Sequence, residues 1–156
     1  MAKVLDEHEE ETPLQAAITE RKYLAYAIQK LGKKSQKTGN YSVSFGVLFT
    51  DILFEQIFEG LPGTLFGAKG KKMVTYKAPM LLYPNSKDVT ITLKKSKTID
   101  EDEVKALLTK FIKKHKKGDT QDNMLFLLDN MHKSFDDYTE ALKYFKKGSI
   151  NTKRKK

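Results

Sequence analysis

Residues 60–76 read GLPGTLFGAKGKKMVTY, and this stretch decides the fold. Gly60 is placed to end one helix, Pro62 suits the first turn of the next, and Gly70 precedes an alternating strand at Met73–Tyr76. A Walker-type phosphate loop needs two glycines five residues apart before a Lys, and these glycines lack that spacing. The stretch therefore predicts a helix–turn–helix–strand corner, in which Gly63 and Gly67 let a neighbouring element lie close to a helix over 64–69.

Hydrophobic periodicity predicts the elements around this corner. Apolar residues at helical spacing predict helices over 15–31 and 50–60. Alternation predicts strands over 41–45 and 89–93, while 33–40 is expected to be a loop. The resulting order of helix, strand, helix, helix, strand, strand predicts an α+β, winged-helix-like domain with three helices and a small antiparallel sheet.

Composition divides the chain into an acidic tail (1–13), the winged-helix-like domain (14–95), a helical extension (98–147) and a basic tail (148–156). The extension carries helical patterns over 98–114, from 120 and from 134. Single amphipathic helices need a surface on which to bury their apolar face. We expect the extension to bind a partner and to stay apart from the core of the domain. Its contact face comprises Leu107, Leu108, Phe111, Leu128, Tyr138 and Phe145.

Several kinds of chemistry are absent from the sequence. Without cysteine there is no disulfide or thiolate site, and His8, His115 and His132 are not at metal-ligand spacing. We expect no metal and no cofactor. The sequence also has no apolar run long enough for a membrane span and no signal-peptide pattern at its start, so we expect a cytosolic protein that binds no membrane.

The charge distribution favours an acidic partner. Residues 1–12 hold five acids and one lysine, which leaves 28 basic and 15 acidic side chains in the rest. Nucleic acid, anionic lipid and acidic protein surfaces all suit such a field, and a lysine-rich surface without a partner is the plain alternative. The third helix, Pro62–Ala68, lacks side chains that read bases, which argues against sequence-specific DNA binding.

Three ordered blocks resemble the costars family of small cytoskeletal proteins: SFGVLF at 44–49, IFEGLPGTL at 57–65 and KKMVTY at 71–76. The same module forms the C-terminal actin-binding part of the striated-muscle activators of Rho signalling. The resemblance covers about residues 15–94 and implies a winged-helix-like fold, a role in actin dynamics and no catalysis. Lys77-Ala78-Pro79 and residues 83–88 depart from the family pattern, so contacts through this loop are the least transferable.

We therefore expect a cytoplasmic, cytoskeletal protein that binds or modulates actin filaments, or another acidic cytoskeletal protein. Its expected contacts are Lys33, Lys34, Lys69, Lys71 and Lys72. The alternative is a structural or adaptor subunit of a large multi-protein assembly, such as a ciliary axoneme, docked through the C-terminal helices. A third hypothesis, unspecific nucleic-acid binding, rests on net charge and topology.

Overall fold

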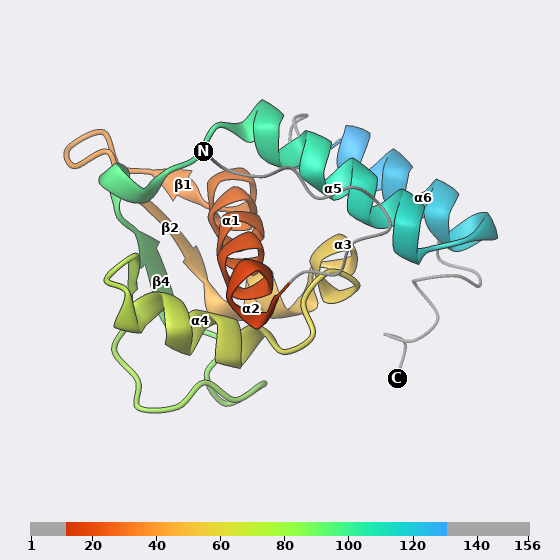
Figure 1. The fold of residues 1–156 in the computed structure, drawn as a ribbon. Coiled ribbons are helices and arrows are strands. Elements are labelled where there is room, and N and C mark those ends of the chain that lie inside the picture. The colour runs from red at the N-terminus through yellow and green to blue at the C-terminus, as the bar shows by residue number, and fades with distance from the viewer. Residues whose placement is uncertain (1–11, 131–156) are drawn as a thin grey trace.

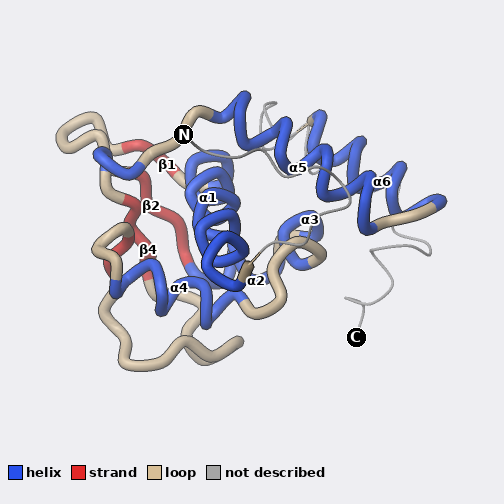
Figure 2. The backbone as a smooth tube through the Cα atoms, in the orientation of Figure 1, coloured by secondary structure: helices blue, strands red, loops and turns tan. Residues whose placement is uncertain are grey.

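The computed structural model describes residues 12–130, which form an α+β fold of six α-helices and a four-stranded antiparallel sheet. The first helix, α1 (Pro13–Leu31), occupies the centre (Figure 1). The strands gather on one side of α1, and the last two helices lie on the other (Figure 2). The expected tails lie wholly or almost wholly outside the described residues.

Local sequence explains both ends of α1. Thr12 and Gln15 form a capping box, in which each backbone N–H donates to the other side chain, at 3.1 Å and 3.0 Å, and Pro13 fits the first turn. The helix ends at Gly32, where the carbonyl of Ser42 approaches too closely for any side chain. Residues Tyr23–Ile28 are all buried, so the second half of α1 is the centre of the core.

The sheet has the order β1-β2-β4-β3. Its strands are β1 (Lys33–Lys34), β2 (Tyr41–Ser44), β3 (Val74–Thr75) and β4 (Thr90–Leu93). β2 and β4 are joined by backbone pairing and by a 3.0 Å hydrogen bond between the hydroxyls of Ser42 and Thr92. The expectation of a plain loop over 33–40 is wrong at its start, because Lys33 and Lys34 pair with β2 in a hairpin.

Of the helix expected over 50–60, only α3 (Ile52–Glu55) forms, and it follows α2 (Phe45–Thr50), a helix that was not expected. Ser44 caps α2, and its hydroxyl accepts from the N–H of Val47 at 3.4 Å. Asp51 is extended between the two helices, and its carboxylate accepts from Phe54 N–H at 3.0 Å. Two local caps therefore start two short helices, and the helical part of 50–60 ends at Glu55. The next helix, α4 (Leu61–Gly70), is longer than expected.

The role expected for the α4 glycines is also wrong within this chain. A Cβ added at Gly63 or Gly67 would meet no atom within 4 Å. Close approach is needed instead at Gly32 and at Gly46, where Lys87 passes at about 3.0 Å from the position of a Cβ. Gly63 and Gly67 therefore face open space.

Two helices of the expected extension complete the same core. They are α5 (Glu101–His115) and α6 (Gly118–Asp129), which follow a short 3-10 helix, η1 (Lys95–Lys97). α5 packs on α1 and on α6, and α6 reaches α3. The buried side chains of this pair are Val104, Leu108, Ile112, Met124, Leu127 and Leu128.

The start of α5 is fixed to α1 by polar contacts. The amide of Gln29 accepts from Ile99 N–H at 2.9 Å and donates to Ile99 C=O at 3.3 Å, and Lys30 pairs with Glu101 at 2.9 Å. For the described residues, the expectation that the extension stays apart from the core is wrong, because α1 supplies the apolar surface that α5 requires. The boundary at residue 95 stays a prediction.

Candidate partner-binding surface

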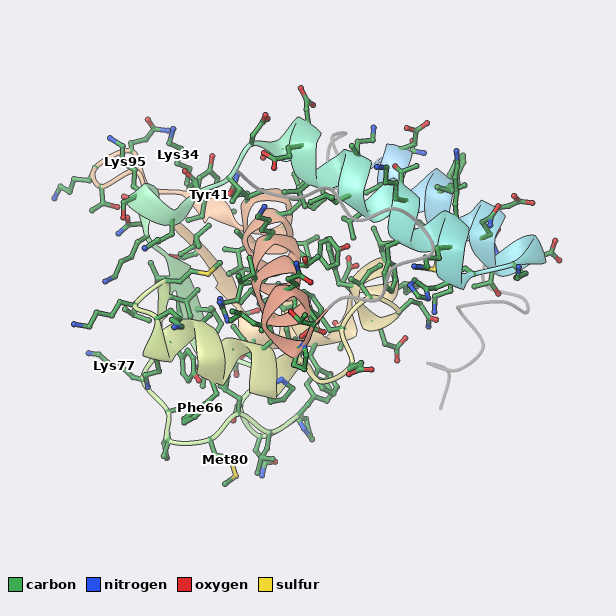
Figure 3. The ribbon with its side chains drawn as sticks, in the orientation of Figure 1. Lys34, Tyr41, Phe66, Lys77, Met80 and Lys95 are labelled. Carbon is green, nitrogen blue, oxygen red and sulfur yellow. The ribbon has the colours of Figure 1, made fainter. Side chains whose placement is uncertain are left out.

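Strand register brings lysines from three parts of the sequence to one end of the sheet. Lys34 lies opposite Tyr41, Tyr41 opposite Leu93, and Leu93 opposite Val74. The lysines that flank these positions must therefore meet at that end. We call this surface the basic end, and it comprises Lys33, Lys34, Lys71, Lys72, Lys94 and Lys95. Figure 3 shows Lys34, Tyr41 and Lys95 together at one corner of the molecule.

Backbone contacts hold the basic end in place. The N–H of Lys95 donates to the side chain of Asn40 at 2.8 Å, and the N–H of Lys94 donates to the carbonyl of Met73 at 3.1 Å. Gly39 has a φ of +81°, and the aliphatic stem of Lys95 lies 2.7 Å from where its Cβ would be. A side chain at position 39 would therefore displace Lys95.

Lys72 occupies a backbone conformation that normally favours glycine. Its φ is +60°, and it follows α4 in a Schellman motif, with Lys72 N–H bonded to Lys69 C=O at 3.0 Å and Met73 N–H to Ala68 C=O at 2.9 Å. The left-handed conformation costs a non-glycine residue about 1–2 kcal/mol. Glycine would remove this strain, so the lysine side chain is a candidate for a role outside folding.

The basic end has little internal charge compensation. Within residues 12–130, the ion pairs are Lys22–Glu103, Lys30–Glu101 and Lys105–Asp129, and none includes a lysine of the basic end. Lys69 lies one turn earlier and is placed differently, with its ammonium 4.3 Å from the centre of the Tyr76 ring. The structure thus gathers four of the five expected lysines and sets Lys69 beside them.

The expected contact face of the extension is largely occupied within the chain. Leu108 and Leu128 are buried, and Leu107 and Phe111 pack partly against the core. Phe111 meets the ring of Tyr23 edge-on at 6.1 Å. The assignment of Leu108 and Leu128 to a partner is therefore wrong in this fold. Tyr138 and Phe145 lie outside the described residues.

A hollow of about 290 Å³ between α1 and α5 is lined by Tyr26, Lys30, Glu101, Asp102 and Lys105. Burial, with Glu101 and then Asp102 nearby, raises the pKa of Tyr26 to about 12. Lys30 and Glu101 pair across the hollow at 2.9 Å. The Lys30–Glu101 pair therefore links α1 to α5, which indicates a structural role for the side chains that line the hollow.

Sequence reasoning did not include Lys94 and Lys95 among the expected contacts. The signal was present in the strand pattern, because β2 and β4 share an end once they pair antiparallel. Among residues 12–130, no three His, Cys, Asp or Glu side chains are grouped to hold a metal ion. None of the helices in that range is long and apolar enough to cross a membrane.

Comparison with known proteins gives matches to the first part of the chain. Residues 18–94 match the family model described as Costars. A rice (Oryza sativa subsp. indica) "Costars family protein" is 48% identical over 66 residues, which are 42% of this chain and 75% of the relative. The "Costars family protein ABRACL" of Bos taurus is 45% identical over 74 residues, 47% of this chain and 90% of the relative.

Human ABRACL is 46% identical over 70 residues, 45% of this chain and 85% of the relative. The solution structure of the human HSPC280 protein is 43% identical, covers 49% of this chain and 89% of its own, and has a TM-score of 0.45. The matched region ends before α5, so α5 and α6 lie beyond it.

Proposed function

The chain belongs to the costars family, and from this premise we propose that it is a non-enzymatic cytoskeletal protein of the cytoplasm that associates with actin filaments through its basic end. The actin role follows from the family resemblance. We choose the basic end because strand register brings together lysines from β1, from the end of α4 and from the end of β4.

An uncompensated lysine surface suits an acidic filament. Lysines in water interact weakly one at a time, but several on one surface add to a field that attracts and orients an acidic partner. Such binding weakens as salt rises, because the charges remain exposed and are screened. The strained Lys72 adds a second argument, since its side chain is retained where glycine would stabilise the fold.

The winged-helix description belongs to the same proposal. α1, the α2–α3 pair and α4 supply three helical segments, β2, β4 and β3 supply the sheet, and the connection over 76–89 supplies the wing. Nucleic-acid binding has less support. The exposed positions of α4 include Gly63, Phe66 and Gly67, which offer no side-chain hydrogen bonds to bases.

The test is co-sedimentation of the full-length protein with actin filaments over a series of salt concentrations. We expect pelleting at low and near-physiological salt, and loss of it at high salt. The double variant Lys33→Glu, Lys34→Glu should weaken binding about tenfold, since reversing exposed interface charges costs on the order of 1 kcal/mol or more. Lys113→Glu with Lys114→Glu is the matched control, because this exposed pair lies at the end of α5, outside the basic end.

Lys72→Gly separates binding from folding. It should raise the free energy of unfolding by about 1 kcal/mol through relief of the left-handed strain and should also reduce pelleting. A folded wild-type protein that does not pellet with actin refutes the proposal. If the protein pellets with microtubules and not with actin, its partner is a different filament. If both double lysine variants lose filament binding equally, net charge determines binding and the basic end has no special role.

A further inference from the structure

We propose that α4 and the 76–89 loop form a second docking surface, which takes an acidic amphipathic helix of a partner protein. It goes beyond the actin proposal, since it uses a different face. Exposed large apolar side chains lie on both elements and on the neighbouring α2. We call them the apolar patch: Val47 and Phe49 of α2, Phe66 of α4, and Met80, Leu82 and Tyr83 of the loop. Phe66 is 71% exposed and Met80 is 65% exposed.

The patch is presented by a fixed part of the fold. Leu81 is buried in the core, so the loop is anchored between the exposed Met80 and Leu82. The hydroxyl of Ser86 accepts from the N–H of Leu82 at 3.0 Å and donates to the carbonyl of Met80 at 3.4 Å. A loop held in this way loses little further freedom on binding, which favours association.

The loop is also fixed to its neighbours. Tyr83 stacks on Phe49 of α2 with ring centres 4.7 Å apart, and the N–H of Gly46 donates to Lys87 C=O at 2.9 Å. On the α4 side, Lys69 lies over the ring of Tyr76 at the start of the loop. Figure 3 shows Phe66, Met80 and Lys77 on the side of the molecule away from α5 and α6. Exposed apolar side chains bordered by polar ones are typical of a protein-binding site.

The charged residues around the apolar patch indicate the charge of the helix that would bind there. Lys69, Lys77 and Lys87 are exposed, and Asp88 is the one acidic residue in the segments 61–70 and 76–89. An occupant with acidic residues beside an apolar stripe therefore complements both the centre and the rim. An amphipathic helix presents these two kinds of side chain on adjacent faces.

The exposed face of α4 favours a helix as the form of that occupant. Leu61–Ala68 carries no charged residue, whereas the solvent side of a surface helix is normally polar. Gly63 and Gly67 flank Phe66 on this face, and neither internal packing nor a positive φ requires glycine at either position. Glycine lowers helix stability relative to alanine, and its absent side chain lets a second backbone approach around Phe66.

The binding experiment uses the full chain and a synthetic amphipathic helical peptide with leucine on one face and glutamate on the other, followed by fluorescence anisotropy. A peptide with lysine in place of glutamate is its control. We expect the glutamate peptide to bind and the lysine peptide to fail. Phe66→Ala and Met80→Ala should each weaken binding about tenfold or more, whereas Leu14→Ala, at a 67% exposed leucine of α1, should not.

The double variant Gly63→Ala, Gly67→Ala distinguishes a binding role of these two glycines from a purely structural one. The melting temperature should rise, because alanine favours the helix, while peptide binding should weaken, because the added methyl groups hold the two backbones apart. Unchanged binding in this variant and in Phe66→Ala overturns the proposal. So does equal binding of both peptides, or binding to anionic vesicles in place of the peptide. Phe66→Ala should pellet with actin as the wild type does, so this proposal and the actin proposal fail separately.

Discussion

Truncating Leu108 tests whether α5 is part of the folding core. Leu108 is fully buried in the cluster shared with α1, so Leu108→Ala removes buried methyl groups and leaves a cavity between helices. Such changes cost about 2–5 kcal/mol, a large part of the roughly 5–15 kcal/mol by which domains are stable. A loss of about 3 kcal/mol lowers the melting temperature by roughly 10 °C in a chain of this size.

The assay is urea and thermal unfolding followed by circular dichroism, with Leu14→Ala as the exposed leucine control. We expect one cooperative transition, shifted strongly in Leu108→Ala and by at most about 0.5 kcal/mol in Leu14→Ala. Equal shifts in the two variants would refute the packing of α5 on α1. Two separate transitions, with only the weaker one moved, would support the expectation from sequence that the helical segment folds apart from the domain.

Two further predictions concern the same contact between α1 and α5. The fold raises the pKa of Tyr26 to about 12, while a tyrosine in the unfolded chain loses its proton near pH 10. The free energy of unfolding should therefore fall as the pH rises from 10 to 12. Tyr26→Phe should lack this part of the loss when urea midpoints are compared at neutral pH and between pH 10 and 12. Gln29→Ala leaves the Ile99 backbone groups without their partner and should lower the free energy of unfolding in urea by about 1–3 kcal/mol. Gln36→Ala, in the exposed hairpin, is the control and should change it very little. Similar losses in both variants would contradict the assigned role of Gln29.

Residue pattern predicted element types better than it predicted what the elements touch. The apolar stripe of α5, with Val104, Leu108 and Ile112, follows from helical spacing alone, and all three are buried. Spacing does not say which surface covers a stripe, and the partner proved to be α1 of the same chain. Helix α2 was not predicted because its six residues are too few to show helical spacing, and its first residue, Phe45, was assigned to a strand.

Only part of the basic end was predictable, because the sequence does not show which segments lie side by side. Lys33, Lys34, Lys71 and Lys72 stand out by composition, but only strand register shows that they lie at one end with Lys94 and Lys95. The two-residue strand β1 has exposed lysines and no alternation, so hairpin geometry and not side-chain burial defines it. The left-handed backbone of Lys72 could not be expected, because that conformation normally calls for glycine.

The contact between Tyr23 and Phe111 also sets an order of events during synthesis. These rings are 88 residues apart in the chain, and ribosomes add about 5–20 residues per second, so Phe111 is made roughly 4–18 s after Tyr23. For that interval α5 is not yet available to cover this surface of α1. A nascent chain stalled before residue 101 should therefore expose this surface to chaperones, and release of α5 from the ribosome should end that exposure.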